Sequence, residues 1–393
     1  MRTGLAVFFS LYALLYGGMH LYVYFKLRGA FGRGWGLSVP FALVSLFMIF
    51  GARALWLLDF GDAHALRAAM SYASYFWMAF IFLVFTAFLF LDVLALSLGL
   101  AGMLFSPAFP GILPSRRSRA AAALGFASAV CFYGWFEALD VRPVHVTIVT
   151  DKLPEGVERL RVAQLSDVHL GWIVGEDRLA RMLAVVKDAA PDVLVVTGDL
   201  VDGDMDARDG EAALFREVLP PLGKFAVTGN HEYYAGIRQA LAFKERAGIR
   251  VLRGEAVEAG GMVIAGVDDP SGKWTSSGGR SEVEVLGGIP RDRFVLLLKH
   301  RPLVDGESSG LFDLQLSGHT HGGQIWPFYW LTRLANDYRP GLRAIAPSVG
   351  GGSAHAAGAG ESRIYVSNGT GTWGPPVRFF APPEVTVIDI VRK

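Results

Sequence analysis

Short clusters of metal-binding residue types recur between residues 164 and 321, each directly after a short apolar run. Five of the nine histidines fall in these clusters. The apolar runs have the length of buried strands, so the clusters are expected at strand ends, where α/β enzymes place their chemistry. The clusters are Asp167 to His169, Gly198 to Asp202, Gly229 to Glu232, the single His300, and Gly318 to His321.

The segments between these clusters have the apolar spacing of amphipathic helices. Strands are predicted over residues 144–149, 160–165, 193–197 and 224–227, and helices over 179–186, 211–219 and 237–247. Strands without helices follow at 263–267, 294–298, 314–316, 364–366 and 385–391. Segments 270–288 and 348–360 are predicted to be loops. The repeated order of strand, polar cluster and helix predicts an α/β domain with right-handed crossovers over residues 144–393.

Apolar residues are concentrated before about residue 140. The whole chain is 52% hydrophobic and 19% charged, which is too apolar for an ordinary soluble protein. Four segments, 5–27, 37–58, 72–96 and 120–139, reach the roughly 20 residues needed to span a bilayer. We therefore expect an all-α transmembrane region of about four helices over residues 1–143. Asp92 lies inside the third segment, and a helix–helix hydrogen bond is favoured there over a functional role.

Basic residues in two loops predict the orientation in the membrane. Lys26, Arg28 and Arg33 follow the first segment, and a second group, Arg116, Arg117 and Arg119, precedes the fourth. The positive-inside rule places both loops in the cytoplasm, although Arg53 runs against this count. A multi-pass protein of the cell (inner) membrane is expected, with its catalytic domain on the extracytoplasmic side.

The net charge of +1 offers no general basis for binding a nucleic-acid polymer. The single cysteine, Cys131, excludes an intramolecular disulfide and any cysteine-rich zinc motif. A metal ion would therefore be held by histidine, aspartate and asparagine.

The clusters have the composition of a site for two metal ions. Imidazole and carboxylate suit Mn²⁺, Fe or Zn²⁺, and two ions about 3.5–4 Å apart need a bridging carboxylate. Asp167 and His169 can turn towards one ion, and Asp199 is the natural bridge. Asn230 offers a neutral oxygen. His319 and His321 can each reach a different ion. Any one cluster alone is more commonly a turn or a cap, and a lone histidine such as His300 is more commonly a core residue.

Taken together, the clusters resemble the calcineurin-like metallophosphoesterase family over about residues 145–393. The resemblance implies a four-layer α-β-β-α sandwich of two mixed sheets flanked by helices. It implies two ion sites that share one carboxylate: the first formed by Asp167, His169, Asp199 and His321, the second by Asp199, Asn230, His300 and His319. The tail Gly371 to Pro376 resembles a membrane-attached bacterial subgroup.

The resemblance also implies catalytic roles. His231 would donate a proton to the leaving oxygen, Asp202 would orient His231, and Glu232 would be a structural hydrogen-bond acceptor. Protein-phosphatase members carry arginine and glycine where Gly203 and Asp204 follow Asp202 here, which argues against phosphoprotein substrates. Arg301 or Arg378 could substitute for the missing arginine.

The expected function is that of a membrane-anchored dinuclear-metal phosphoesterase. A metal-bridging hydroxide would attack phosphomonoesters or phosphodiesters, with lipid-linked or pyrophosphate substrates among the candidates. The alternative is a catalytically silent membrane receptor or scaffold. The aromatic residues near the clusters could face a membrane or an acyl chain, or could pack the core or its rim: Trp172, Trp326, Phe328, Tyr329 and Trp330.

Overall fold

The computed structural model describes residues 2–57, 64–105, 108–203, 205, 208–275, 279–345 and 361–393. They form two compact units. The first covers Met1–Phe136 and Gly374–Val377, and the second covers Glu137–Trp373 and Arg378–Lys393. The predicted loop at 348–360 lies outside the described residues.

The first unit contains four long helices. These are α1 (Arg2–Phe31), α2 (Trp35–Leu57), α3 (His64–Leu104) and α4 (Arg116–Glu137), with a short 3-10 helix, η1 (Phe109–Ile112), before α4. Among the described residues, Ala65–Leu104 and Arg116–Glu137 are long and apolar enough to cross a membrane, and the apolar stretch Trp35–Gly51 of α2 is shorter. Two of the four predicted spans thus meet the criteria of length and composition, and the other two stay predictions.

Asp92 of α3 joins two helices of this unit. Its carboxylate accepts hydrogen bonds from the Tyr22 hydroxyl, at 2.6 Å, and from the Lys26 ammonium, both on α1. The predicted helix–helix contact is confirmed. The basic residues predicted in loops lie partly in helices, because α1 continues to Phe31 and includes Lys26 and Arg28, and α4 begins at Arg116.

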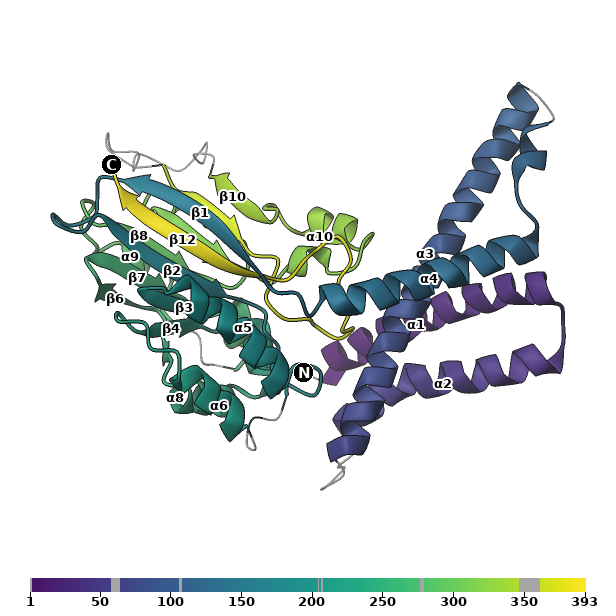
Figure 1. Ribbon diagram of the computed structural model, residues 1–393, viewed down its shortest axis with the longest axis horizontal. Helices are drawn as coiled ribbons and strands as arrows, with labels where there is room; N and C mark the ends of the chain where they lie inside the picture. Colours follow the sequence, from purple (N-terminus) through teal and green to yellow (C-terminus); the bar gives the residue numbers. More distant parts are fainter. Residues whose placement is uncertain are drawn as a thin grey trace. The chain divides into compact units, whose positions relative to one another are not determined.

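The second unit contains two mixed six-stranded sheets (Figure 1). The first sheet has the order β1-β12-β2-β3-β4-β5, in which β12 is antiparallel to β2 and the other pairs are parallel. Its strands are β1 (Arg142–Thr150), β2 (Arg159–Leu165), β3 (Val193–Thr197), β4 (Lys224–Val227), β5 (Arg250–Val251) and β12 (Glu384–Arg392). The predicted strands of this sheet are confirmed, and β5 is an addition.

The second sheet has the order β10-β11-β9-β8-β7-β6, with four parallel central strands and an antiparallel strand at each edge. Its strands are β6 (Glu255–Ala259), β7 (Met262–Gly266), β8 (Val295–Leu298), β9 (Leu314–Ser317), β10 (Gly341–Ala344) and β11 (Arg363–Val366). The edge strands β6 and β10 were not predicted, because they lack the apolar runs of buried strands.

One continuous apolar core lies between the two sheets. Val162 and Val195 of the first sheet belong to the same buried cluster as Ile264, Leu296 and Leu316 of the second. The opposite face of the second sheet is also buried, in a cluster that contains Leu297. Strands buried on both faces explain the unbroken apolar runs of the sequence.

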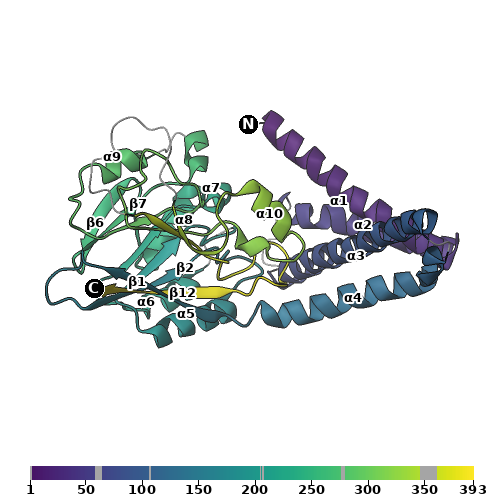
Figure 2. The same ribbon diagram turned by 90° about the horizontal axis from the view of Figure 1, so that it is seen from above.

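Helices connect the parallel strands. They are α5 (Glu176–Ala189), α6 (Asp209–Arg216), α7 (Asn230–Ala235), α8 (Ile237–Arg246), α9 (Glu282–Leu286) and α10 (Tyr329–Ala335). Leu179, Met182, Leu183 and Val186 form the buried stripe of α5, which packs against the first sheet (Figure 2). The loop predicted at 270–288 is wrong in part, because the described part of this segment contains a 3-10 helix, η2 (Pro270–Thr275), and α9.

Candidate metal centre

The predicted ligands lie where parallel strands of the two sheets end. Asp167, Asp199 and Asn230 follow β2, β3 and β4 of the first sheet, and His300 and His319 follow β8 and β9 of the second. The carboxyl ends of parallel strands meet at one edge of a sheet, so residues far apart in sequence are brought together. All seven predicted ligands belong to one connected set of side chains.

The backbone at these residues is unusual. Eight described non-glycine residues have a positive φ, and five of them are predicted ligands: Asp167, His169, Asp199, His319 and His321. Left-handed backbone is unfavourable for residues with a Cβ, and such strain concentrates at functional sites. Glycine is required at position 318, because a Cβ there would lie 1.9 Å from the Ser166 hydroxyl. The turn that carries His319 can therefore pack closely on the turn that carries Asp167.

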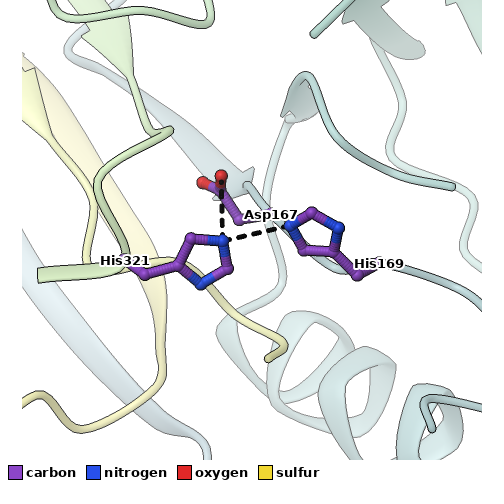
Figure 3. A group of neighbouring side chains, drawn as sticks. All are labelled: Asp167, His169 and His321. Carbon is purple, nitrogen blue, oxygen red and sulfur yellow. Dashed lines mark hydrogen bonds and ion pairs between the residues drawn. The ribbon is translucent and has the colours of Figure 1, made fainter. Parts of the chain in front are cut away.

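Asp167, His169 and His321 form a first group of possible metal ligands (Figure 3). His321 Nε2 lies 3.5 Å from Asp167 Oδ1 and 3.0 Å from His169 Nε2. Burial lowers the pKa of His169 to about 4 and holds the pKa of His321 well below its usual range. A neutral imidazole is the form that binds a metal ion. The Nε2 atoms of His169 and His321 point at each other, and His321 Nε2 also faces the Asp167 carboxylate.

Asp199, His300 and His319 form a second group, to which Asn230 adds its side-chain oxygen. His300 Nδ1 lies 2.9 Å from the Thr197 carbonyl oxygen, which can only accept a hydrogen bond. In a neutral ring this leaves His300 Nε2 unprotonated. That atom lies 3.2 Å from Asp199 Oδ2, 3.2 Å from Asn230 Oδ1 and 3.1 Å from His319 Nδ1.

Four electron-pair donors thus converge in the second group. Without a cation, their lone pairs need a hydrogen between them, supplied by the Nδ1–H tautomer of His319, by the Asn230 amide or by protonation of a ring. Burial by itself lowers the pKa of His300, but the neighbouring Asp199 carboxylate outweighs it and raises the pKa to about 10. A bound divalent cation would satisfy the same donors without that proton, and the hydrogen bond to Thr197 fixes the tautomer that such a ligand needs. The residues therefore fit a metal ion.

Asp199 belongs to the second group and lies beside the first, where it forms a further group of possible ligands with His169 and His231. Its Oδ2 lies 3.2 Å from His300 Nε2 and 3.9 Å from His169 Nε2, and its Oδ1 accepts a hydrogen bond from the His231 backbone N–H at 2.8 Å. A single carboxylate between two sets of histidines is the arrangement that two neighbouring cations require.

His231 and Asp202 form a pair beside the first group. The distance from His231 Nδ1 to Asp202 Oδ1 is 2.7 Å, and the His231 ring centroid lies 4.6 Å from that of His169. Burial opposes the charged form, but the carboxylates of Asp199 and Asp202 raise the pKa of His231 to about 9. The Trp373 ring packs edge-on at 5.7 Å from the His231 centroid.

Glu232 holds the turns that carry the ligands. Its carboxylate accepts hydrogen bonds from the backbone N–H groups of Asp199, Leu200 and Gly229, at 3.0, 2.9 and 2.6 Å. Its expected role as a structural acceptor is confirmed. Sequence reasoning missed its partner, Lys244, which lies on α8 and whose ammonium is 2.9 Å from the carboxylate.

The two candidate arginines have different surroundings. Arg378 is fully buried and donates to the backbone carbonyls of Gly369, Gly371, Asn368 and Ala381. The suggestion that Arg378 could grip a phosphate is therefore wrong. Arg301 is partly exposed, and its guanidinium donates to Asp269 at 2.8 and 3.2 Å.

The aromatic residues near the clusters also differ in exposure. Trp326, Phe328 and Trp330 are exposed, whereas Tyr329 is half-buried. Trp172 is half-buried with the Arg208 guanidinium 5.7 Å from its ring centroid. The first three therefore lie at the surface and do not pack in the core.

Comparison with known proteins places residues 160–323 in the calcineurin-like phosphoesterase family model. The chain is 44% identical to an uncharacterized metallophosphoesterase of Aquifex aeolicus, over 66% of this chain and 96% of the relative. It is 31% identical to an uncharacterized metallophosphoesterase of Helicobacter pylori, over 77% and 79% of the two chains. It is also 32% identical to a transmembrane protein with metallophosphoesterase domain of Danio rerio, over 69% and 62%.

Proposed function

The chain belongs to the calcineurin-like metallophosphoesterase family, and on this premise we propose that it is a membrane-anchored phosphoesterase that uses two divalent metal ions. The observation that carries the proposal is the position of Asp199, whose Oδ2 lies 3.2 Å from His300 Nε2 in the second group and 3.9 Å from His169 Nε2 in the first.

The two ions would share Asp199 and would otherwise have separate ligands. Asp167, His169, Asp199 and His321 would hold the first ion, and Asp199, Asn230, His300 and His319 the second. The ions, which we expect to be Mn²⁺, Fe or Zn²⁺, supply Lewis acidity that activates a water for attack and polarises the phosphoryl oxygens. The Asn230 amide adds an oxygen without adding negative charge, which preserves that acidity.

His231 would transfer the proton in this reaction. Asp202 accepts a hydrogen bond from His231 Nδ1, so the ring is held in one orientation and its Nε2 is left for the leaving oxygen of the substrate. Glu232 and Lys244 would take no part in proton transfer, since both are completely buried and paired with each other.

The proposed substrates are small phosphoesters, either monoesters or diesters, with lipid-linked phosphates and pyrophosphates included. Arg301, directly after His300, is the candidate to contact a phosphoryl oxygen, and its bidentate pair with Asp269 fixes the guanidinium plane. A nucleic-acid polymer is not expected, because the chain has a net charge of only +1.

Residues 1–143 are proposed to be the anchor and residues 144–393 the catalytic domain, a four-layer α-β-β-α sandwich. In this proposal all four long helices cross the cell membrane, and the catalytic domain lies on the extracytoplasmic side. Support comes from the lengths of α1 to α4 and from Arg116, Arg117 and Arg119, which the positive-inside rule assigns to the cytoplasm. Protease accessibility of the C-terminal tail in intact and permeabilised cells tests this orientation.

The enzyme proposal is tested with the detergent-solubilised full chain and a chromogenic phosphodiester. Turnover should require an added divalent ion, with Mn²⁺, Zn²⁺ and Fe compared, and Asp199→Asn should abolish it. Asp292→Asn is the matched control, because Asp292 is exposed on a turn of the catalytic unit. If the unmodified chain with metal is no faster than Asp199→Asn, the enzyme proposal fails and a receptor or scaffold replaces it.

A further inference from the structure

An exposed apolar surface lies next to the candidate metal centre in the catalytic unit. We call it the apolar rim and define it by large hydrophobic side chains on α10 and the segments that flank it: Trp326, Phe328, Trp330, Leu331, Leu334 and Phe380. The helix α10 has no buried residue at all. An isolated exposed leucine needs no explanation, but six large apolar side chains on neighbouring segments indicate an interaction surface.

The rim is joined rigidly to the metal centre. His321 opens the 3-10 helix η3 (His321–Gly323), and a Cβ on Gly323 would lie 2.4 Å from Tyr329 Cα, so the turn packs directly on the first residue of α10. The Trp326 backbone N–H donates to the Phe379 carbonyl at 3.1 Å, which ties the segment before α10 to the one that carries Phe380. Movement of the rim would therefore move the His321 turn.

Trp373 connects the segment before α10 to His231. The Gln324 side chain donates to the Trp373 carbonyl at 3.1 Å and accepts from the Trp373 backbone N–H at 2.9 Å. Trp373 is half exposed, and its ring packs against His231. An exposed aromatic ring therefore lies between the segment that carries the rim and the proposed proton donor.

The residue types of the apolar rim point to a lipid bilayer as its partner. Tryptophan and phenylalanine beside arginine are typical of segments that lie in the interface of a bilayer. The Arg333 guanidinium lies 5.4 Å from the centroid of the Trp330 ring. Residues 326–345 carry a net charge of +2, from the three arginines Arg333, Arg339 and Arg343 and the single acid Asp337. A positive charge at this surface favours contact with anionic lipid headgroups.

The chain itself keeps the catalytic unit near a membrane if its apolar helices span one. Its helices α3 and α4 are long and apolar enough to cross one. Only four residues, 138–141, separate the end of α4 from the start of β1. A link of that length spans at most about 18 Å, so the catalytic unit is confined to the neighbourhood of the lipid surface when α4 is in the bilayer.

We infer that the apolar rim inserts into the interface of the lipid bilayer and admits phosphoesters that carry acyl chains directly from it. The inference rests on the proposed membrane anchor and phosphoesterase activity. It adds the substrate class, amphipathic phosphoesters presented by the membrane, and it assigns α10 as the entry.

The docking is tested without any activity measurement. Leu334→Cys and Leu219→Cys are made in a Cys131→Ala background, labelled with an environment-sensitive fluorophore, and placed in lipid nanodiscs as the full chain. Leu219 is the matched control for Leu334, because the two side chains are 81% and 85% exposed. Leu219 lies after α6, away from the rim. Nitroxide lipids should quench the Leu334→Cys label at least about twofold more than the Leu219→Cys label.

Equal quenching at the two positions overturns the inference. A blue-shifted Leu334→Cys label that lipid nitroxides do not quench also overturns it, because a protein surface, such as a second copy of the chain, would then cover the rim. Both outcomes leave the phosphoesterase proposal intact.

The substrate class is tested by a ratio of activities. Leu334→Gln should lower the ratio of turnover on a long-chain phosphoester in vesicles to turnover on a short-chain soluble analogue about tenfold, and Leu219→Gln should not change it. An unchanged ratio for Leu334→Gln overturns the entry role. If the unmodified chain hydrolyses neither substrate, the proposed activity fails, while the quenching experiment still decides whether the rim docks.

Discussion

The Lys244 ammonium lies 2.9 Å from the Glu232 carboxylate, and neither side chain is exposed to solvent. Because Glu232 also accepts hydrogen bonds from the backbone of Asp199 and Gly229, this ion pair connects α8 to two turns that carry predicted ligands. The charge of Glu232 is needed at this position, and Lys244 balances it in an environment that water does not reach.

Lys244→Met should therefore be strongly destabilising. It leaves a buried carboxylate without its counterion, which costs about 3–5 kcal/mol, or roughly 10 °C in the thermal midpoint of a domain of this size. Tryptophan fluorescence of the full chain in detergent measures the midpoint. Lys187→Met is the control, because the Lys187–Glu217 pair has the same separation, 2.9 Å, but is exposed. Equal midpoints for the two variants would contradict the structural role.

The proton-transfer role of His231 predicts a dependence on the leaving group. His231→Gln should lower kcat roughly 10²–10⁴-fold for an alkyl phosphoester, whose leaving oxygen needs a proton. The loss should be much smaller for a nitrophenyl ester, which leaves as a stable anion. Asp202→Asn should show the same selectivity in weaker form, because Asp202 only orients the ring. A loss that is equal for both substrates would assign His231 to binding instead.

Much of the catalytic fold follows from the sequence, because its strands are buried on both faces and appear as unbroken apolar runs. Val193–Thr197 is buried at every position and was predicted with the same bounds. The short strand Arg250–Val251 and the edge strands Glu255–Ala259 and Gly341–Ala344 lack that signal, since each is only partly buried. They form because a neighbouring strand offers free backbone groups, which is a tertiary effect.

The candidate site, like the fold, could be predicted from the sequence only in part. His300 could be placed in it only through the resemblance to a family, because a lone histidine after a strand carries no signal of its own. Lys244 was not identified, and Arg378 was given the wrong role, since a lysine on an amphipathic helix and an arginine in a proline-rich tail are ordinary surface residues in sequence. Asn230 was expected in a loop but begins α7, where Glu232 caps the Gly229 N–H.

Arg378→Lys tests whether Arg378 organises the segment around Gly371. The guanidinium donates to five different backbone carbonyls, including that of His321, and an ammonium has only three donors without the planar geometry. At least one carbonyl is left unpaired, so we expect a loss of about 3 kcal/mol in the free energy of unfolding. Denaturant titration measures it. Arg181→Lys, at an exposed position on α5, should change the stability little, and a similarly small change at Arg378 would refute the prediction.

The proposed sharing of Asp199 between two ions predicts an uneven loss of metal among variants. His319→Ala removes a ligand that contacts only the second group, at 3.1 Å from His300 Nε2, so the purified chain should retain about one ion of two. Asp199→Ala removes the carboxylate that is proposed to bridge the two ions, so both ions should be lost. Elemental analysis after dialysis counts the ions per chain, and the thermal midpoint checks them independently, because an ion that binds only the folded state raises it. Equal metal content in the two variants would mean that Asp199 does not bridge two sites.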